Sequence, residues 1–269
     1  MTYWDAIVLG LVQGLTEFLP ISSSGHLVLM REVLDVETVH ALAIDASLHF
    51  ATALAVLLYF RKDIWRLVLA AFGWVRGVAP AVSDRVLIFA LVLGTIPAAL
   101  AGILFEDRID ALFHSATAVA WVLIASAVFF LFAEHVYKHN PMRKELTVSK
   151  GVGIGLFQVL ALLPGMSRSG ATIGGGMLLG LTRENAARFS FLLSFPIILG
   201  VGIMKLLSLG GAIEFTRGEW GALTVGMIVS FVVGVITIHY FLRYLRNHTL
   251  VPFAVYCAGL GMITFALLA

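Results

Sequence analysis

Long apolar segments separated by short polar ones follow one another along the chain, and six of them are long enough to cross a membrane. A membrane-spanning helix needs about 20 predominantly apolar residues. The six segments cover residues 41–60, 86–105, 115–137, 185–208, 219–242 and 249–268. The pattern therefore predicts an all-α integral membrane protein with six transmembrane helices.

Two further apolar stretches, residues 3–30 and 149–181, are interrupted near their middle. Pro20 and Pro164, each with Ser and Gly neighbours, divide them into halves that are too short to span. Broken helices are stable at membrane depth only where protein or a wet cavity covers their exposed backbone. We therefore expect both stretches to form re-entrant helical hairpins.

The order of these segments indicates a duplication within a single membrane domain, residues 1–269. One hairpin and three spans make up residues 1–137, and the same set makes up residues 149–269. Because each half has an odd number of spans, the second half must be inverted relative to the first. In inverted repeats the broken helices meet near the midplane, and this is where a site is expected.

Composition and charge agree with a membrane location and give the orientation. The chain is 60% hydrophobic and 13% charged with a mean hydropathy of +0.98, whereas soluble domains are about 25% charged. Most of the 18 lysines and arginines fall in the loops on one side, which is expected to be cytoplasmic, so both termini lie outside. No signal peptide and no basic tract for nucleic acid are visible. The single cysteine, Cys257, excludes an internal disulfide and is expected to pack against lipid or the core.

The first hairpin contains an acidic residue where hydrocarbon is expected. Gln13 and Glu17 are four residues apart, so on a helix they share one face. A carboxylate at membrane depth costs about 2.5–3.5 kcal/mol even on insertion scales, and such residues are usually functional. A hydrogen bond across the bundle is the alternative role for Glu17, and we favour a function.

The second half of this hairpin offers hydroxyls and an imidazole. Ser22, Ser23 or Ser24 can cap the helix after Pro20, and Gly25 allows a ligand to approach the backbone. The free N–H groups at a helix start form an anion site. His26 can act as a nucleophile or a proton donor near neutral pH, although a lone histidine is more often structural.

The second hairpin supplies a cation at the equivalent break. Arg168 lies between Ser167 and Ser169, with Gly170 and Thr172 following. A guanidinium binds phosphate through two parallel hydrogen bonds, and the hydroxyls add donors. An arginine that snorkels to the cytoplasmic face is the alternative, but its place at the break argues against it. We therefore expect Glu17, His26 and Arg168 to converge.

Other polar positions give weaker signals. Asp45 and His49 are four residues apart at the start of the first span. They either contact and orient the residues of the site or simply lie at the membrane–water interface. Glu134 and His239 lie near span ends, where contact with solvent is the simpler expectation. The run of glycines at residues 174–176 is expected to allow close helix packing.

At the level of motifs, QGLTE followed by PISSSGH, and PGMSRSGAT in the second half, resemble the undecaprenyl pyrophosphate phosphatases, also called bacitracin-resistance proteins. The resemblance covers essentially the whole chain. It implies a homodimeric enzyme of the bacterial inner membrane that removes one phosphate from undecaprenyl pyrophosphate and so recycles the lipid carrier for cell-wall synthesis. It also implies a site that faces the periplasm and requires a divalent cation, Mg²⁺ or Ca²⁺.

The resemblance also carries roles to individual residues of this chain. Glu17 and Gln13 match the acidic pair that would hold the metal, Ser23 and His26 the serine-histidine stretch, and Arg168 with Ser167 the phosphate-binding motif. Many family members have a glutamate where this chain has Gln13, so one metal-binding carboxylate is missing here.

The residues alone leave the attacking group open among Ser23, His26 and a water activated by Glu17. They also leave open a second class of function. Inverted repeats with broken helices are equally the architecture of secondary transporters, so the anion site could instead carry phosphate or a lipid head group across the membrane. Release of inorganic phosphate by the purified protein in detergent distinguishes the two. A purely structural scaffold would explain none of the polar hairpin residues.

Overall fold

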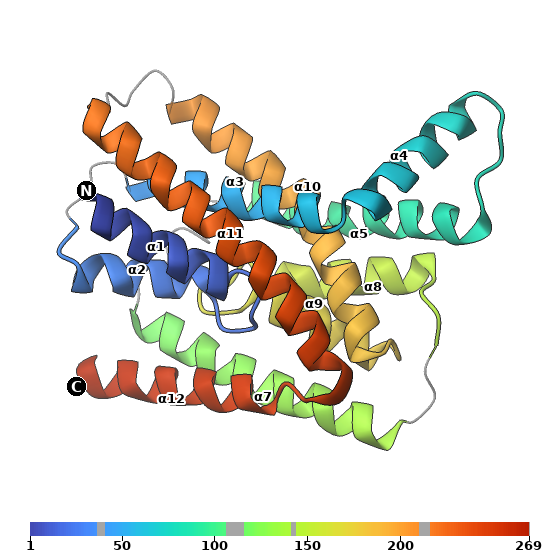
Figure 1. Cartoon of the computed structure of the whole chain (residues 1–269). Coiled ribbons are helices and arrows are strands. Elements are labelled where there is room, and N and C mark those ends of the chain that lie inside the picture. The colour runs from blue at the N-terminus through green and yellow to red at the C-terminus, as the bar shows by residue number, and fades with distance from the viewer. Residues whose placement is uncertain (37–40, 106–115, 141–143, 210–215, 269) are drawn as a thin grey trace.

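The computed structural model describes residues 1–36, 41–105, 116–140, 144–209 and 216–268, and these form eleven helices (Figure 1). The helices are α1 (Tyr3–Thr16), α2 (Ser23–Val33), α3 (Ala41–Tyr59), α4 (Arg61–Val75), α5 (Val82–Leu104), α7 (Ala116–His139), α8 (Val148–Leu160), α9 (Arg168–Leu178), α10 (Arg183–Leu209), α11 (Arg217–Asn247) and α12 (Val251–Leu268). The all-α prediction is confirmed for this part of the chain.

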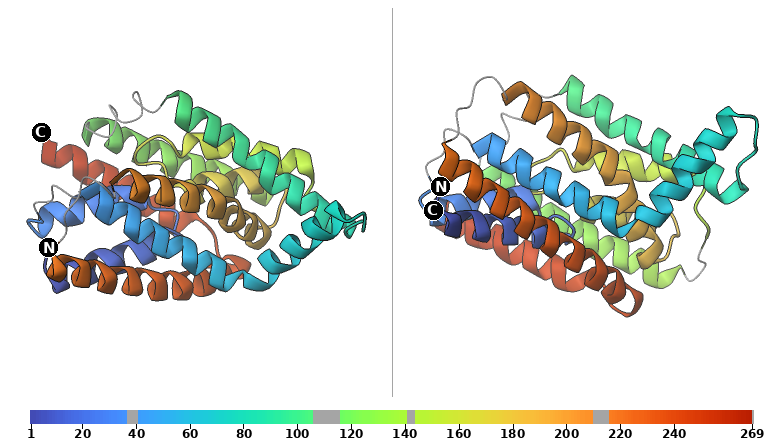
Figure 2. Two further views of the ribbon diagram at one scale, coloured as in Figure 1. Left: turned by 90° about the horizontal axis from the view of Figure 1, so that it is seen from above. Right: turned by 45° about the horizontal axis from the view of Figure 1, so that its top comes forward.

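A helix covers most of each predicted span, namely α3, α5, α7, α10, α11 and α12. Among the described residues, Val82–Leu104, Thr117–His139 and Arg217–Asn247 are single helices long and apolar enough to cross a membrane. The chain is therefore a multi-pass membrane protein. Figure 2 shows the long helices side by side, with both termini at the same end of the bundle.

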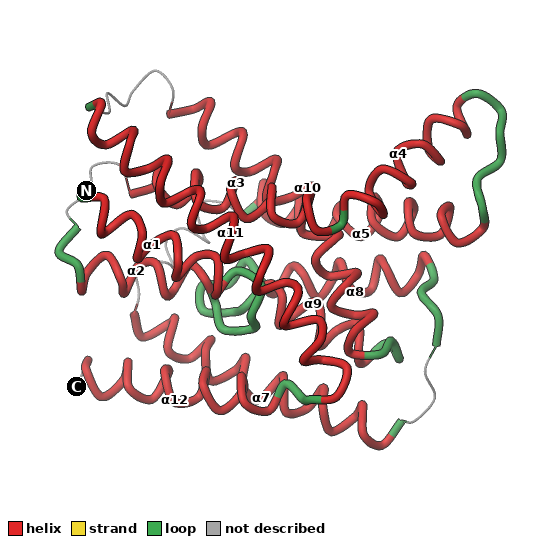
Figure 3. The backbone as a smooth tube through the Cα atoms, viewed as in Figure 1, coloured by secondary structure: helices red, strands yellow, loops and turns green. Residues whose placement is uncertain are grey.

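Each interrupted stretch forms two short helices joined by a loop. In the first, α1 ends at Thr16 and α2 begins at Ser23; in the second, α8 ends at Leu160 and α9 begins at Arg168. The two loops lie against each other in the middle of the molecule, as Figure 3 shows, and the Ser169 hydroxyl donates to the backbone oxygen of Leu19 at 3.1 Å. The fold thus brings both breaks to one place.

The elements pack in reciprocal pairs. The first hairpin helix of the N-terminal half, α1, packs on α11 of the C-terminal half, and α8 packs on α5 in return. In addition, α7 packs on α12, and α3 packs on both α11 and α10. Around the loops the core is aromatic, because Phe18, Phe130 and Phe191 are fully buried there. The two halves are therefore interleaved, and neither forms a separate body.

The segment between the first two predicted spans, residues 61–85, is expected to be a cytoplasmic loop, and this is wrong for its first part. Residues Arg61–Val75 form α4, which is bent by 78° from α3 and extends away from the bundle in Figure 1. Trp65 and Phe72 are more than half exposed on it, so α4 presents apolar side chains outside the bundle. Basic residues near its ends hid it from a search for span-length apolar segments.

The expectation that Glu134 contacts solvent is also wrong. Glu134 is only 7% exposed and forms an ion pair with Arg183, whose Nε donates to Glu134 Oε1 at 2.9 Å. The same oxygen accepts from the backbone N–H of Leu250 at 2.8 Å. The carboxylate therefore joins the ends of α7, α10 and α12. By contrast, the packing predictions are confirmed, since Cys257 is buried and Gly174 and its two following glycines pack against other helices.

Candidate active site

The two hairpin breaks meet through an ion pair at the centre of the molecule. Arg168 Nη2, at the first residue of α9, donates a hydrogen bond to Glu17 Oε1, at the end of α1. Glu17 is only 6% exposed. The predicted convergence of Glu17, His26 and Arg168 is confirmed for Glu17 and Arg168, whereas the His26 ring contacts Ser22 and Tyr256 instead. A buried carboxylate is stable only when it is paired and hydrogen-bonded, and Arg168 meets that requirement.

Three further side chains contact the second oxygen of this carboxylate. Gln13 Nε2 donates to Glu17 Oε2 at 3.0 Å, and the Ser23 hydroxyl donates to it at 2.7 Å. His49 Nε2 lies 3.4 Å away. The carboxylate thus joins side chains from α1, α2, α3 and α9, and it holds the start of α2 against α1.

His49 belongs to the site, which the sequence left undecided. Its Nδ1 lies 2.8 Å from the backbone oxygen of Asp45, and because a carbonyl only accepts, Nδ1 carries a proton. The Asp45 side chain in turn accepts from Arg31 Nη1 of α2. This contact, together with the imidazole contact to Glu17, ties α3 to both parts of the first hairpin. The four-residue spacing of Asp45 and His49 was the available signal.

His26 lies on α2 with both ring nitrogens occupied. Nδ1 is 2.8 Å from the backbone oxygen of Ser22, so it carries a proton, and Nε2 then accepts from the Tyr256 hydroxyl at 2.6 Å. The two rings also stack, with centroids 5.6 Å apart. His26 is therefore oriented by α12, and its Nε2 lone pair is covered until Tyr256 moves.

Tyr256 was not found by sequence reasoning. It lies on α12, next to Cys257, whose thiol is 3.5 Å from the backbone oxygen of Pro20 in the first loop. No motif or spacing distinguishes Tyr256 from other tyrosines of apolar segments. Only the packing of α12 against the hairpin reveals it.

The serines after Pro20 do not cap α2 as expected. Ser22 occupies the cap position with a φ of 69°, and its side chain makes no capping hydrogen bond. A buried residue other than glycine in this left-handed region is strained, and such strain is common at functional sites. Ser24 and Gly25 follow in the first turn, with only Ser22 atoms near the place where a Gly25 side chain would begin. The Ser23 hydroxyl donates to Glu17 instead, so neither Ser22 nor Ser23 caps α2 with its side chain.

The hydroxyls of the second hairpin mainly hold the two breaks together. Ser167 caps α9 by accepting from the Gly170 N–H at 3.2 Å, and its hydroxyl lies 3.0 Å from that of Ser169. Thr172 donates to the Arg168 backbone oxygen at 2.8 Å and is also 2.6 Å from the Ser190 hydroxyl. A side chain at Gly170 would meet Phe130. These contacts fix the position of Arg168.

Several buried polar atoms of this centre have no hydrogen-bond partner within the described residues. They are Arg168 Nη1, Gln13 Oε1 and Ser22 Oγ. Buried polar groups without partners are rare, and each marks a place for a ligand, ion or water. A free guanidinium nitrogen suits an anion, whereas a free amide oxygen suits a cation.

A divalent cation would have to bind mainly through oxygen. No three His, Cys, Asp or Glu side chains come together as metal ligands in the described ranges. The available oxygens are those of Glu17, Gln13 and Ser23, of which only Glu17 is a carboxylate. Oxygen donors of this kind fit Mg²⁺ or Ca²⁺, with water completing the shell, and do not fit a zinc site.

Comparison with known proteins adds to this geometry. Residues 6–263 match the family model described as "Bacitracin resistance protein BacA". The chain belongs to the BacA family. It is 41% identical to "Undecaprenyl-diphosphatase 3" of Frankia alni, with 100% of this chain and 96% of the relative covered. It is 42% identical to "Undecaprenyl-diphosphatase" of Corynebacterium striatum over 100% of this chain and 95% of the relative.

A third relative extends the match to another group of bacteria. "Undecaprenyl-diphosphatase" of Thioalkalivibrio sulfidiphilus is 43% identical, with 97% of both chains covered. The BacA match includes both hairpins, the ion pair of Glu17 and Arg168 and the histidines around it. The family resemblance noted from the motifs is therefore confirmed.

Proposed function

We propose that the centre around Glu17 and Arg168 hydrolyses undecaprenyl pyrophosphate. The chain is an undecaprenyl-diphosphatase, which produces undecaprenyl phosphate and inorganic phosphate and thereby recycles the lipid carrier for cell-wall synthesis. One observation carries the assignment to this centre. Arg168 has one terminal nitrogen on Glu17 and the other buried with no partner among the described residues, and Ser23 is hydrogen-bonded to the same carboxylate.

In this proposal Arg168 binds the pyrophosphate. Its Nη1 donates to a phosphate oxygen while Nη2 remains on Glu17, so the guanidinium orients the carboxylate and the substrate together. The N–H groups at the start of α2, which no serine side chain caps, add donors for the same anion. Ser167, Ser169 and Thr172 act by holding α9 in place, and Ser22 and Ser24 lie beside the substrate.

Ser23 is the nucleophile in this proposal, because its hydroxyl already donates to Glu17 Oε2 at 2.7 Å. The serine oxygen attacks the terminal phosphorus as its proton passes to Glu17, and undecaprenyl phosphate leaves with the electrons of the broken P–O bond. Water then cleaves the phosphoserine to give inorganic phosphate and free Ser23. Phosphoryl transfer depends mainly on positioning and charge stabilisation, which the fixed Arg168 provides. His26, held between Ser22 and Tyr256, orients the start of α2.

A divalent cation, Mg²⁺ or Ca²⁺, would be held by Glu17 with Gln13 Oε1, the buried amide oxygen that has no partner among described residues. When bound, it neutralises phosphate charge. We expect a chelator to lower the activity and added Mg²⁺ or Ca²⁺ to restore it. Full activity after exhaustive chelation would exclude this part of the proposal.

We further propose that the chain is an inverted repeat with six spans and two re-entrant hairpins. The reciprocal packing of α1 on α11 and of α8 on α5 supports it, since inversion exchanges these two pairs. In this orientation the loops rich in lysine and arginine lie on the cytoplasmic side of a bacterial inner membrane, and the site opens to the periplasm. Labelling of single cysteines at Thr2 and at Lys138 from each side of sealed vesicles tests this topology.

The function is tested with the purified protein in detergent and defined lipid substrate. Wild type should release inorganic phosphate, and Ser23→Ala should lower the rate by at least about a hundredfold. Ser47→Ala is the matched control, because Ser47 is a buried serine that only donates to the Ala43 backbone oxygen at 2.7 Å.

Rapid quenching with labelled substrate identifies the nucleophile. An acid-stable, base-labile phosphoprotein is expected for Ser23, whereas an acid-labile species would assign His26 and no covalent species would assign water. Undiminished hydrolysis by Glu17→Gln or Arg168→Gln would refute the whole centre.

A further inference from the structure

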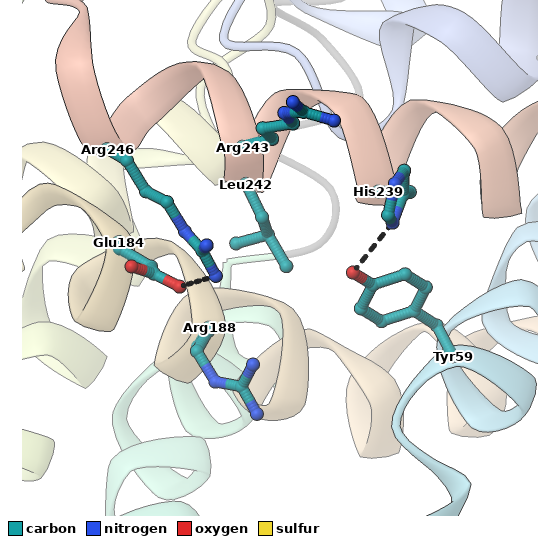
Figure 4. Close-up of a pocket in the computed structure, with 7 residues that line it drawn as sticks. All are labelled: Tyr59, Glu184, Arg188, His239, Leu242, Arg243 and Arg246. Atoms are coloured by element: carbon teal, nitrogen blue, oxygen red, sulfur yellow. Dashed lines mark hydrogen bonds and ion pairs between the residues drawn. The ribbon is translucent and has the colours of Figure 1, made fainter.

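A polar cavity lies away from Glu17, where the ends of three helices meet (Figure 4). It has a volume of about 300 Å³ and is lined by Tyr59 of α3, Glu184 and Arg188 of α10, and His239, Arg243 and Arg246 of α11. These residues come from the end of α3, the start of α10 and the end of α11. The cavity therefore lies toward the end of the bundle opposite the two chain termini (Figure 1).

The cavity has an excess of positive charge. Of its three arginines, Arg246 pairs with Glu184 at 2.8 Å, and Arg188 pairs at 3.0 Å with Asp63, a residue of α4 that also contacts Arg66. Within the described residues no carboxylate pairs with Arg243, the third arginine that lines the cavity. Glu184 is thus the single acid that lines the cavity together with three guanidiniums and an imidazole.

Donors of several kinds line the same cavity. Arg243 can offer two parallel N–H groups, and Arg188 and Arg246 can offer those that their carboxylates leave free. The Tyr59 hydroxyl lies 3.5 Å from His239 Nδ1 (Figure 4). Clustered arginines with a hydroxyl and an imidazole are suited to a phosphate monoester, whose oxygens only accept when it is ionised. The mechanism of hydrolysis uses none of these side chains.

The helix face that lines the cavity continues as an apolar stripe. Ile228, Val232 and Ile236 of α11 are each about half exposed, at 57%, 46% and 49%. They follow one another at intervals of four residues, and the helical period places Arg243 on the same face. A ligand with its anionic group among the arginines could therefore rest an acyl or prenyl tail against this stripe.

We propose that this cavity is a second anion site that binds a phosphate monoester group, with the head group of a membrane lipid as its source. The ligand class is a lipid with one terminal phosphate, and free inorganic phosphate has the same recognition chemistry. The site is separate from the hydrolytic centre, so the proposal does not depend on which residue attacks the pyrophosphate.

Native mass spectrometry of the detergent-solubilised full chain can count the bound lipid. The probes are dioleoyl phosphatidic acid, which carries a phosphate monoester, and dioleoyl phosphatidylcholine, which does not. All proteins carry Arg168→Gln, so that binding at the hydrolytic centre is suppressed. We expect one phosphatidic acid to be retained and Arg243→Gln to weaken it by about tenfold, because hydrogen bonds to charged groups are the strong ones.

Arg76→Gln is the matched control, since Arg76 lies at the end of α4 over the Phe72 ring and outside the cavity, and its loss changes net charge equally. It should leave phosphatidic acid binding unchanged. Unaltered elution and melting profiles establish that each variant is folded. If inorganic phosphate displaces the lipid at equal concentration, the anion site is supported, and its ligand is the free anion and not a lipid head group. Equal retention of phosphatidylcholine, or equal binding by Arg243→Gln and Arg76→Gln, would overturn the proposal.

Discussion

The contact between α8 and α5 allows a sharp test of how packing supports the active site. A side chain at Gly155 would place its Cβ 2.1 Å from the backbone oxygen of Gly94, where ordinary contacts begin at 3.4 Å. Gly155→Ala therefore forces the two helices about 1.3 Å apart, because neither backbone atom can rotate away. The small residues of this contact are what allow the helices to approach so closely.

The magnitude follows from two opposing effects. Overpacking of a close contact typically costs about 1–3 kcal/mol, and a contact with rigid backbone belongs at the upper end. Replacing glycine by alanine within a helix stabilises the folded state by about 0.5–1 kcal/mol. We therefore expect Gly155→Ala to lower the free energy of unfolding by about 2 kcal/mol, or the melting temperature by roughly 4–8 °C.

Gly102→Ala is the matched control within the partner helix α5. A Cβ there would lie 3.9 Å from Leu162 Cδ2, which is ordinary contact, so only the helix-propensity gain remains. Both variants are purified in the same detergent and compared by thermal unfolding and by phosphate release. Gly155→Ala should also lose activity, because α8 positions the loop that presents Arg168, and a displacement of about 1 Å can reduce a rate a hundredfold. Equal stability and activity of the two variants would refute the reasoning.

Three further predictions concern individual contacts. Arg168→Lys should lower kcat/KM by at least about a hundredfold in phosphate-release assays, because an ammonium cannot hold the central carboxylate and the substrate in the fixed geometry of a guanidinium. Tyr256→Phe removes the hydroxyl from His26 Nε2 and should lower kcat by about tenfold, with little effect on melting temperature. Arg183→Ala leaves buried Glu134 without its cation and should lower the free energy of unfolding by about 3–5 kcal/mol in thermal denaturation.

Matched controls separate these effects from general damage. Arg217→Lys makes the same change at an exposed position, and Tyr240→Phe removes a hydroxyl from an exposed tyrosine of α11. Arg66→Ala removes a cation that is 56% exposed, so it should cost less than about 1 kcal/mol. An active Arg168→Lys, a Tyr256→Phe no slower than Tyr240→Phe, or an Arg183→Ala as stable as Arg66→Ala would each contradict the corresponding contact.

The helices of this fold were largely predictable because hydrocarbon imposes a length on them. The six apolar segments had to be helical to satisfy their backbone, and Pro20 and Pro164 marked the two loops. α4 was missed because its apolar run is too short to span a membrane and Lys62 and Arg66 interrupt its first turns. Glu134 was misplaced because the position of a residue near the end of an apolar segment does not show that Arg183 approaches it from another helix.

The active site was predictable only where chemistry coincided with a break in a helix. Glu17 and Arg168 stood out because charged side chains in apolar hairpins are costly. Tyr256 did not, because its role depends on α12 packing against the first loop, and nothing in its local sequence encodes that contact. The same limit applies to Ser22, whose strained backbone depends on the surrounding fold.

The charge balance of the centre explains why its parts come from both halves of the chain. Glu17 and Arg168 neutralise each other, so each can be buried before any substrate arrives. A pyrophosphate then adds negative charge that this pair alone does not offset, and Arg168 keeps only Nη1 for it. A cation on the Glu17 and Gln13 oxygens would supply the missing charge. That position is on the first half of the chain, opposite the arginine.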